Sequence, residues 1–221
     1  MSVITISRQY GSGGDEIVDR ICQVLGYHRF SKLHISQAAA EAGLSEREII
    51  DYSEENYKVK NFIDRLLGRS RQVGEARIWR EDAQGTRITE LEPISEEHAL
   101  ALVKGAVEAA YRAGDVVVVG RAGQVILKDR PGVLHVRIIA PMEDRIQRVR
   151  GQYKLERRVA QDLIDSRDAA SADYLKTFFG VDWADPLLYH IILNTAGMEL
   201  EDAAHAIVEL ARSIQAAAVP A

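Results

Sequence analysis

The chain of 221 residues is 47% hydrophobic and 28% charged, and its formal net charge is −5. This length is sufficient for one hydrophobic core, and no apolar run reaches the roughly 18 residues of a membrane span, so we expect no membrane partner. The negative charge argues against a nucleic-acid partner, because a protein that binds nucleic acid irrespective of sequence needs a basic surface.

The N-terminal segment MSVITISRQY has no secretory signal, so we expect the protein to stay in the cytoplasm. Its run VITI at 3–6 is one of four β-branched segments that are typical of buried strands. The other three are VVVV at 116–119, VLHVRII at 133–139 and HIIL at 190–193. Helical patterns separate these strands, and such an order requires parallel pairing. The sequence therefore predicts an α/β fold with three layers and a parallel sheet.

The helical patterns have clear ends. From Asp15 to Leu25 the apolar residues fall on one helical face. A second helix is expected to begin at Ser95, whose side chain can cap the first turn, and to run to about Arg112. Residues 201–215 also have one apolar face and are expected to close the fold as a helix.

Two regions depart from this order within the single domain predicted for residues 1–221. Residues 43–92 contain charged helical patterns followed by WREDAQGTRITE, which predicts a hairpin around Gln84-Gly85. We interpret this region as an accessory insertion; a homodimer through it stays open, as does the use of its apolar residues to cover its own core. Residues 141–180 carry a basic helix and a second helix, and we expect this lid-like region to cover one end of the sheet.

The segment RQYGSGGDEI at residues 8–17 joins the first strand to the first helix. Free N–H groups and the positive end of the helix dipole converge at such a junction, and glycines let the backbone approach an anion. Gly11, Gly13 and Gly14 are therefore typical of a phosphate site, although a plain tight turn accounts for them equally well.

The standard phosphate loop, G-x-x-x-x-G-K-[ST], is not matched, because Gln9, Asp15 and Glu16 occupy its first-glycine, lysine and hydroxyl positions. A carboxylate about 4 Å from a phosphate oxygen repels it by about 1 kcal/mol in water. Asp15 must therefore point away, pair with an arginine, bind a cation or prevent tight binding. Arg8 is the nearest residue that can supply the lost positive charge.

The ordered segments of the chain resemble the cytidylate kinase-like family, a branch of the nucleoside monophosphate kinases. The matching segments are ITISRQYGSGGDEI, LGYHRFSKLHISQAAAEAGLSE, VVVVGRAGQVILKDRPGVLHVRIIAPMEDRIQRV and FFGVDWADPLLYHIILNTAGMELEDAAHAIVEL. The resemblance implies a three-layer P-loop NTPase-like fold with a helical lid and a helical and hairpin insertion. It also implies transfer of the terminal phosphoryl group of ATP to a nucleoside monophosphate such as CMP, with ATP and Mg²⁺ as cofactors.

The resemblance further implies three sets of site residues. The donor phosphates would be held by Gln9, Tyr10, Gly11, Ser12, Gly13, Gly14, Asp15 and Glu16. The catalytic role of neutralising charge would be taken by Arg8, Arg121, Arg145 and Arg148. The acceptor would be bound by Arg167 and Asp168. A surface turn is the other interpretation of Arg121, and a solvated helix face is an equally good one for Arg145 and Arg148. No metal ligand is predicted among the side chains.

Departures from the family pattern leave two hypotheses. Asp15 stands where a basic residue is common, Ala122 where cytidylate kinases carry an aspartate, and Ala169 and Ser171 where arginines are expected. The first hypothesis is a phosphotransferase that acts on a CMP-like nucleotide or a related small acceptor. The second is a nucleotide-binding or regulatory protein that retains the kinase fold without transfer activity. An assay of phosphoryl transfer to several monophosphates separates them.

Overall fold

The computed structural model of the protein describes residues 2–30, 48–49, 72–81 and 87–218. Its elements in chain order are β1 (Val3–Arg8), α1 (Gly14–Leu25), β2 (His28–Arg29), β3 (Glu48–Ile49), β4 (Gln72–Glu81), β5 (Arg87–Ser95), α4 (Glu96–Ala113), β6 (Val116–Val119), α5 (Gly123–Ile126), β7 (Val133–Ile139), α6 (Met142–Tyr153), α7 (Arg157–Phe179), the 3-10 helix η2 (Pro186–Leu188), β8 (Ile191–Asn194) and α8 (Leu200–Ala218). No helix among these described residues is long and apolar enough to cross a membrane.

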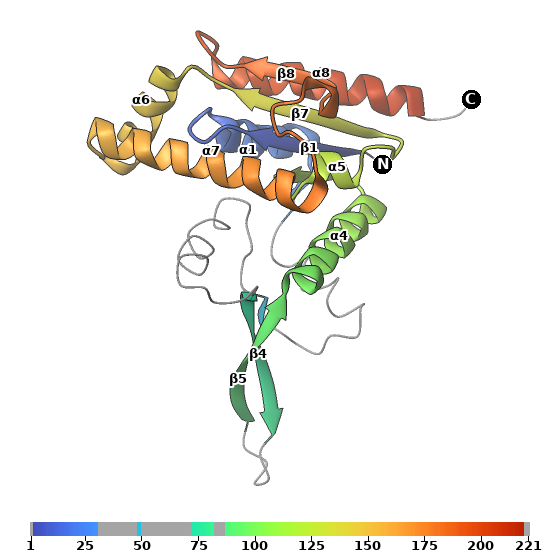
Figure 1. The fold of residues 1–221 in the computed structure, drawn as a ribbon. Coiled ribbons are helices and arrows are strands. Elements are labelled where there is room, and N and C mark those ends of the chain that lie inside the picture. The colour runs from blue at the N-terminus through green and yellow to red at the C-terminus, as the bar shows by residue number, and fades with distance from the viewer. Residues whose placement is uncertain (1, 31–47, 50–71, 82–86, 219–221) are drawn as a thin grey trace.

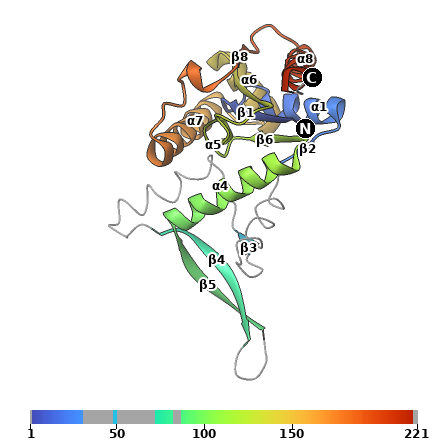
Figure 2. The same ribbon diagram turned by 90° about the vertical axis from the view of Figure 1, so that its right-hand side faces the viewer.

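Five strands form one parallel sheet in the order β2-β6-β1-β7-β8, with β1 at its centre. Helices cover both faces: α1 and α8 lie on one side, and α4, α5 and α7 lie on the other (Figures 1 and 2). The predicted α/β fold with three layers and a parallel sheet is therefore confirmed. All four predicted strands are present, whereas the short β2 was not predicted.

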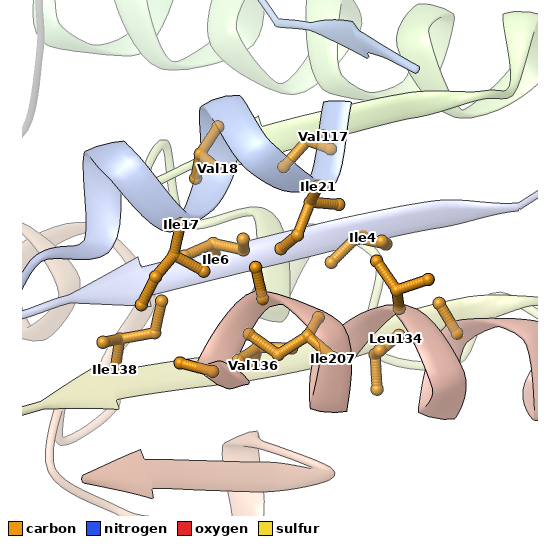
Figure 3. Close-up of a cluster of buried hydrophobic side chains, with 14 of the residues drawn as sticks. Ile4, Ile6, Ile17, Val18, Ile21, Val117, Leu134, Val136, Ile138 and Ile207 are labelled. Carbon is orange, nitrogen blue, oxygen red and sulfur yellow. The ribbon is translucent and has the colours of Figure 1, made fainter. Parts of the chain in front are cut away.

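The main hydrophobic core lies between the sheet and the pair α1 and α8. Alternate residues of β1 and β7 point to this side because successive side chains of a strand face opposite ways. Figure 3 shows their packing against the two helices, which contribute Ile17, Val18, Ile21 and Ile207. The apolar faces predicted for these two helices are thus the faces that the core buries.

The predicted helix ends are also confirmed. The first predicted helix, α1, ends before Gly26, whose φ of 69° is a left-handed conformation that favours glycine. The helix expected from Ser95 to about Arg112 is α4, and Gly114 with a φ of 74° follows it. The two helices of the lid-like region are α6 and α7.

A second sheet, in the order β3-β4-β5, is antiparallel and projects from the body beside α4 (Figures 1 and 2). Trp79 pairs with Thr89 and Glu81 pairs with Arg87, so the two long strands form the predicted hairpin. Its turn at Gln84-Gly85, and most of the charged helical pattern before β4, lie outside the described residues. The extent of the 43–92 insertion therefore stays a prediction.

Candidate functional site

The loop between β1 and α1 depends on glycine at two positions. Gly11 has a φ of 78° and Gly13 a φ of 82°, both in the left-handed region. A Cβ atom on Gly11 would lie 3.0 Å from the carbonyl oxygen of Arg145, and one on Gly13 would lie 2.6 Å from Cδ2 of Leu200. Only glycine fits this path of the backbone, because a larger residue would be strained and would also collide with α6 or α8.

The loop faces a small hollow that α6 closes on the other side. The hollow is lined by Arg8, Gln9, Tyr10, Gly11, Gly13, Gly14, Asp15, Glu16, Arg148, Val149, Gln152 and Tyr153. The first hydrogen bond of α1 is from Ile17 N to Gly13 O at 3.1 Å, and no side chain caps the helix. The N–H groups from Gly13 to Glu16 therefore have no acceptor within the helix, which makes this end of α1 attractive to an anion.

Asp15, in the lysine position of the standard loop, is paired with arginines. Its Oδ2 atom lies 3.3 Å from Nε of Arg8, and its Oδ1 atom accepts a hydrogen bond from Arg29, which also bonds Asp19 at 3.0 Å. Burial opposes ionisation of Asp15, but the guanidinium groups of Arg8 and Arg29 outweigh it and lower the pKa of the carboxyl group. Of the alternatives open for Asp15, pairing with an arginine is the one observed.

Arg145 and Asp168 form contacts that hold the loop in place. Arg145 is only 5% exposed, so the solvated interpretation is wrong for this residue. Its Nη1 atom lies 2.5 Å from Oδ2 of Asp168, and Oδ1 of Asp168 accepts the N–H of Tyr10 at 2.8 Å. Burial raises the pKa of Asp168, and the hydrogen bonds from Tyr10 and Arg145 offset this only in part. Arg167 lies above the ring of Tyr10, with its Cζ atom 5.8 Å from the centroid.

Arg148 connects α6, the loop and the segment after β8. It lines the hollow and is half-buried. Its Nη1 atom donates to Oγ1 of Thr195 at 3.1 Å and lies 3.5 Å from the carbonyl oxygen of Gly11. The interpretation of Arg148 as a purely solvated residue is therefore wrong.

Arg121 lies in a turn after β6 where three consecutive residues have positive φ: Gly120, Arg121 and Ala122. It is half-buried and does not line the hollow. Ala122, at the aspartate position of cytidylate kinases, is fully buried in an apolar cluster with Tyr174, Leu175 and Trp183. Ser171, at an expected arginine position, is buried as well. Two positions that carry charge in the family pattern, 122 and 171, are thus occupied by small buried residues.

Three residues that bond to the loop or to the start of α1 were not predicted from the sequence: Arg29, Thr195 and Ala140. Arg29 reaches Asp15 because β2 lies beside α1, and a strand of only two residues has no sequence pattern. Thr195 donates to the carbonyl oxygen of Ser12 at 2.9 Å. Oε1 of Gln9 accepts the N–H of Ala140 at 3.1 Å, which ties the loop to the end of β7. Thr195 and Ala140 each follow a predicted strand, and that position is the only signal that the sequence offered.

The loop fits a phosphate group better than it fits a metal ion. The described residues contain no group of three His, Cys, Asp or Glu side chains that could hold a metal. Glu16 at the hydroxyl position is exposed, and Asp15 is bound to two arginines. These two side chains therefore do not form a site for Mg²⁺.

The chain resembles known proteins both in sequence and in fold. The sequence model of the cytidylate kinase-like family matches residues 3–197. A search of curated proteins found no match. Among solved structures, an uncharacterized protein from Eubacterium ventriosum has 17% identity and a TM-score of 0.65, and the similarity covers 96% of this chain and 98% of that one.

Two kinases are more distant. Gluconokinase from Sinorhizobium meliloti has 12% identity and a TM-score of 0.47, with 98% of this chain and 93% of that chain covered. Shikimate kinase from Acinetobacter baumannii has 14% identity and a TM-score of 0.43, with 96% and 94% covered.

Proposed function

The chain belongs to the cytidylate kinase-like family, and from this premise we propose that it transfers the γ-phosphoryl group of ATP to a CMP-like nucleoside monophosphate or a related small acceptor. Family membership supports the coarser activity, a nucleotide-binding phosphotransferase. The observation that carries the proposal is the start of α1, where N–H groups without an acceptor in the helix meet a hollow lined by Arg8 and Arg148.

The donor phosphates are held by the loop at residues 9–16. Phosphoryl transfer depends on position and charge neutralisation, so arginines and backbone N–H groups are sufficient without a nucleophilic side chain. Arg8 at the end of β1 and Arg148 on α6 both line the hollow and neutralise the phosphate charge. Arg145 acts indirectly: it is buried, and it positions Tyr10 and Asp168 through hydrogen bonds.

Arg121, Arg167 and Asp168 are our candidates for the acceptor side. The turn that contains Arg121 follows the carboxyl end of β6, and ligands of open α/β sheets bind at such ends. The contacts of Arg167 and Asp168 with Tyr10 support a location next to the loop.

A second candidate function is nucleotide binding without transfer. The burial of Ala122 in an apolar cluster favours it, because that position has no room for the charge that cytidylate kinases carry there. A transfer assay with ATP and CMP, UMP, dCMP and AMP separates the two candidates. Formation of ADP that depends on one acceptor supports the enzyme, and its absence with all four acceptors, in a chain that binds ATP, supports the second candidate.

Replacement of Arg8 by alanine tests the donor site. Hydrogen bonds to charged groups contribute about 1.5–3 kcal/mol, so Arg8→Ala should weaken ATP binding by about tenfold to a hundredfold in calorimetric titration. Arg20→Ala is the matched control, because Arg20 is a partly exposed arginine of α1 that pairs with Glu201 and does not line the hollow. Equal ATP affinity of the wild type and Arg8→Ala would contradict the role of Arg8.

A further inference from the structure

Thr195 is a fully buried residue that lies directly after β8. Its backbone N–H donates to Ile139 O at 3.0 Å, which fixes its position at the end of β7. Its hydroxyl donates to the carbonyl oxygen of Ser12 at 2.9 Å and accepts a hydrogen bond from Arg148 at 3.1 Å. One residue thus connects the end of the sheet through its backbone, and helix α6 and the middle of the loop through its side chain.

The hydrogen bond to Ser12 also orients the next peptide N–H group. A trans peptide is planar, so the C=O of Ser12 and the N–H of Gly13 point in opposite directions. Thr195 holds the C=O on its own side of the loop. The N–H of Gly13 is therefore turned away from Thr195.

The opposite side is the hollow. Gly13 lines it, whereas neither Ser12 nor Thr195 does. Gly13 is also the residue before the first turn of α1, and as a glycine it offers no side chain that could cap this turn. Thr195 consequently stands behind the loop and sets the direction of an N–H group that faces the ligand side.

We propose that Thr195 is a positioning residue for a bound polyphosphate, which it never touches: it holds the Ser12 carbonyl so that the N–H of Gly13 is aimed at a phosphate oxygen. This inference rests on the proposed function and adds to it the group that keeps the loop competent to bind an anion. The positive charge of Arg148 supports the same geometry, because Arg148 donates to Thr195 and also lines the hollow.

The test is calorimetric titration of the full chain with ATP and, separately, with inorganic tripolyphosphate. Thr195→Val keeps the shape of the side chain and removes the hydroxyl, and it should weaken the binding of both ligands by about tenfold, the effect of about one hydrogen bond. Thr195→Ser keeps the hydroxyl and should stay within about twofold of the wild type. If Thr195→Val does not fold, Thr195→Ala removes the hydroxyl without placing a methyl group against Ser12.

Thr5→Val is the matched control. The hydroxyl of Thr5 is also buried and bonds Nδ1 of His135 at 2.7 Å, but it does not reach the loop. Both valine variants should lower the melting temperature by a similar amount, and only Thr195→Val should lose affinity. Equal affinity of Thr195→Val and the wild type would overturn the inference, as would an equal loss of affinity in Thr195→Val and Thr195→Ser. A wild type that binds neither ATP nor tripolyphosphate would overturn the proposed function itself.

Discussion

On β1 and β7, successive side chains alternate between the two faces of the central sheet, and the two faces differ in chemistry. Toward α1 and α8 the strands present the aliphatic residues Ile4, Ile6, Leu134, Val136 and Ile138, and Arg8 follows on this face at the end of β1. Toward the opposite helices the intervening positions are Thr5, Ser7, His135 and Arg137, and all four are buried. The first face is therefore held mainly by aliphatic packing, whereas the second combines an apolar cluster around Val3 and Val133 with a buried polar network.

The polar network follows the register of the two strands. Thr5 lies opposite His135, and Ser7 lies opposite Arg137. Ser7 accepts a hydrogen bond from Nε1 of Trp183 at 2.7 Å, and the guanidinium of Arg137 lies 4.3 Å from the centroid of that ring. The side chain of Arg137 also donates to the hydroxyl of Tyr189 at 3.2 Å.

This difference shows how the sheet serves two purposes. Burial of a polar group is unfavourable unless its hydrogen bonds are made, so a polar face adds less net stability than an aliphatic one. It does, however, fix the positions of the groups that it bonds. Here the polar face attaches the segment with Trp183 and Tyr189 to the strand that leads into the loop.

The aliphatic face should account for most of the stability. Ile4→Ala removes a fully buried side chain from the core and should lower the free energy of unfolding by about 2–5 kcal/mol. The loss should be the same at pH 7 and pH 5, because no titratable group is involved. Urea unfolding at both pH values measures it. Ile192→Ala on the edge strand β8, where the side chain is 39% exposed, should lose less than the core variant. A loss below about 1 kcal/mol for Ile4→Ala would contradict the view that the aliphatic face accounts for most of the stability.

The polar face should make stability depend on pH. Burial, and then the neighbouring His190, lowers the pKa of His135 from 6.5 to about 4. Between these two values the unfolded chain binds a proton that the folded chain does not, so stability is complete above pH 6.5 and falls as the pH drops toward 4. At about 1.36 kcal/mol per pH unit, the contribution of His135 to this loss is on the order of 3 kcal/mol.

Replacement of His135 isolates this contribution. His135→Asn should show a smaller decrease in the free energy of unfolding between pH 7 and pH 4.5 than the wild type, as measured by urea unfolding. His205→Asn is the matched control, because it also removes one histidine, but from an exposed position on α8 outside the polar network. Parallel curves for the wild type and His135→Asn would refute a buried neutral histidine.

The aliphatic face was predictable from the sequence and the polar face was not. Runs such as VITI and VLHVRII indicate buried strands wherever they pair. The contact between Thr5 and His135 depends on the register of strands that are far apart in the sequence, and no local pattern encodes a register. Within VLHVRII, His135 and Arg137 interrupt an apolar run, and only the structure shows that Thr5, Ser7 and Trp183 surround them.

The candidate site was predictable in the same uneven way. The glycine pattern and the position after the first strand predicted the loop, because both are local features. The alternatives for Asp15 included pairing with an arginine, but Arg29 as a partner depends on how β2 lies beside α1. Thr195 is separated from Ser12 by most of the chain. Tertiary contacts of this kind decide which polar groups support a loop, and the sequence does not contain them.

The smallest expected effect belongs to Asp15, whose side chain is 48% exposed. The pKa of its carboxyl group is lowered, because Arg8 and Arg29 outweigh the opposing effect of burial, so its pairing stabilises the fold above the ordinary value of 3.8. This contribution is lost as the pH falls below 3.8 through the lower pKa of the folded state. Since solvent screens a half-exposed pair, Asp15→Asn should cost only a few tenths to about 1 kcal/mol at pH 7.

Urea unfolding of both proteins at pH 7 and pH 3 measures the difference in their free energies of unfolding, which should shrink at pH 3. Asp15 changes the free energy of unfolding below pH 3.8, whereas His135 changes it between pH 6.5 and about 4. Measurements of stability against pH for the two variants therefore separate the two contributions. An Asp15→Asn variant that is more stable than the wild type at pH 7 would contradict this prediction, because the carboxylate would then destabilise the folded protein.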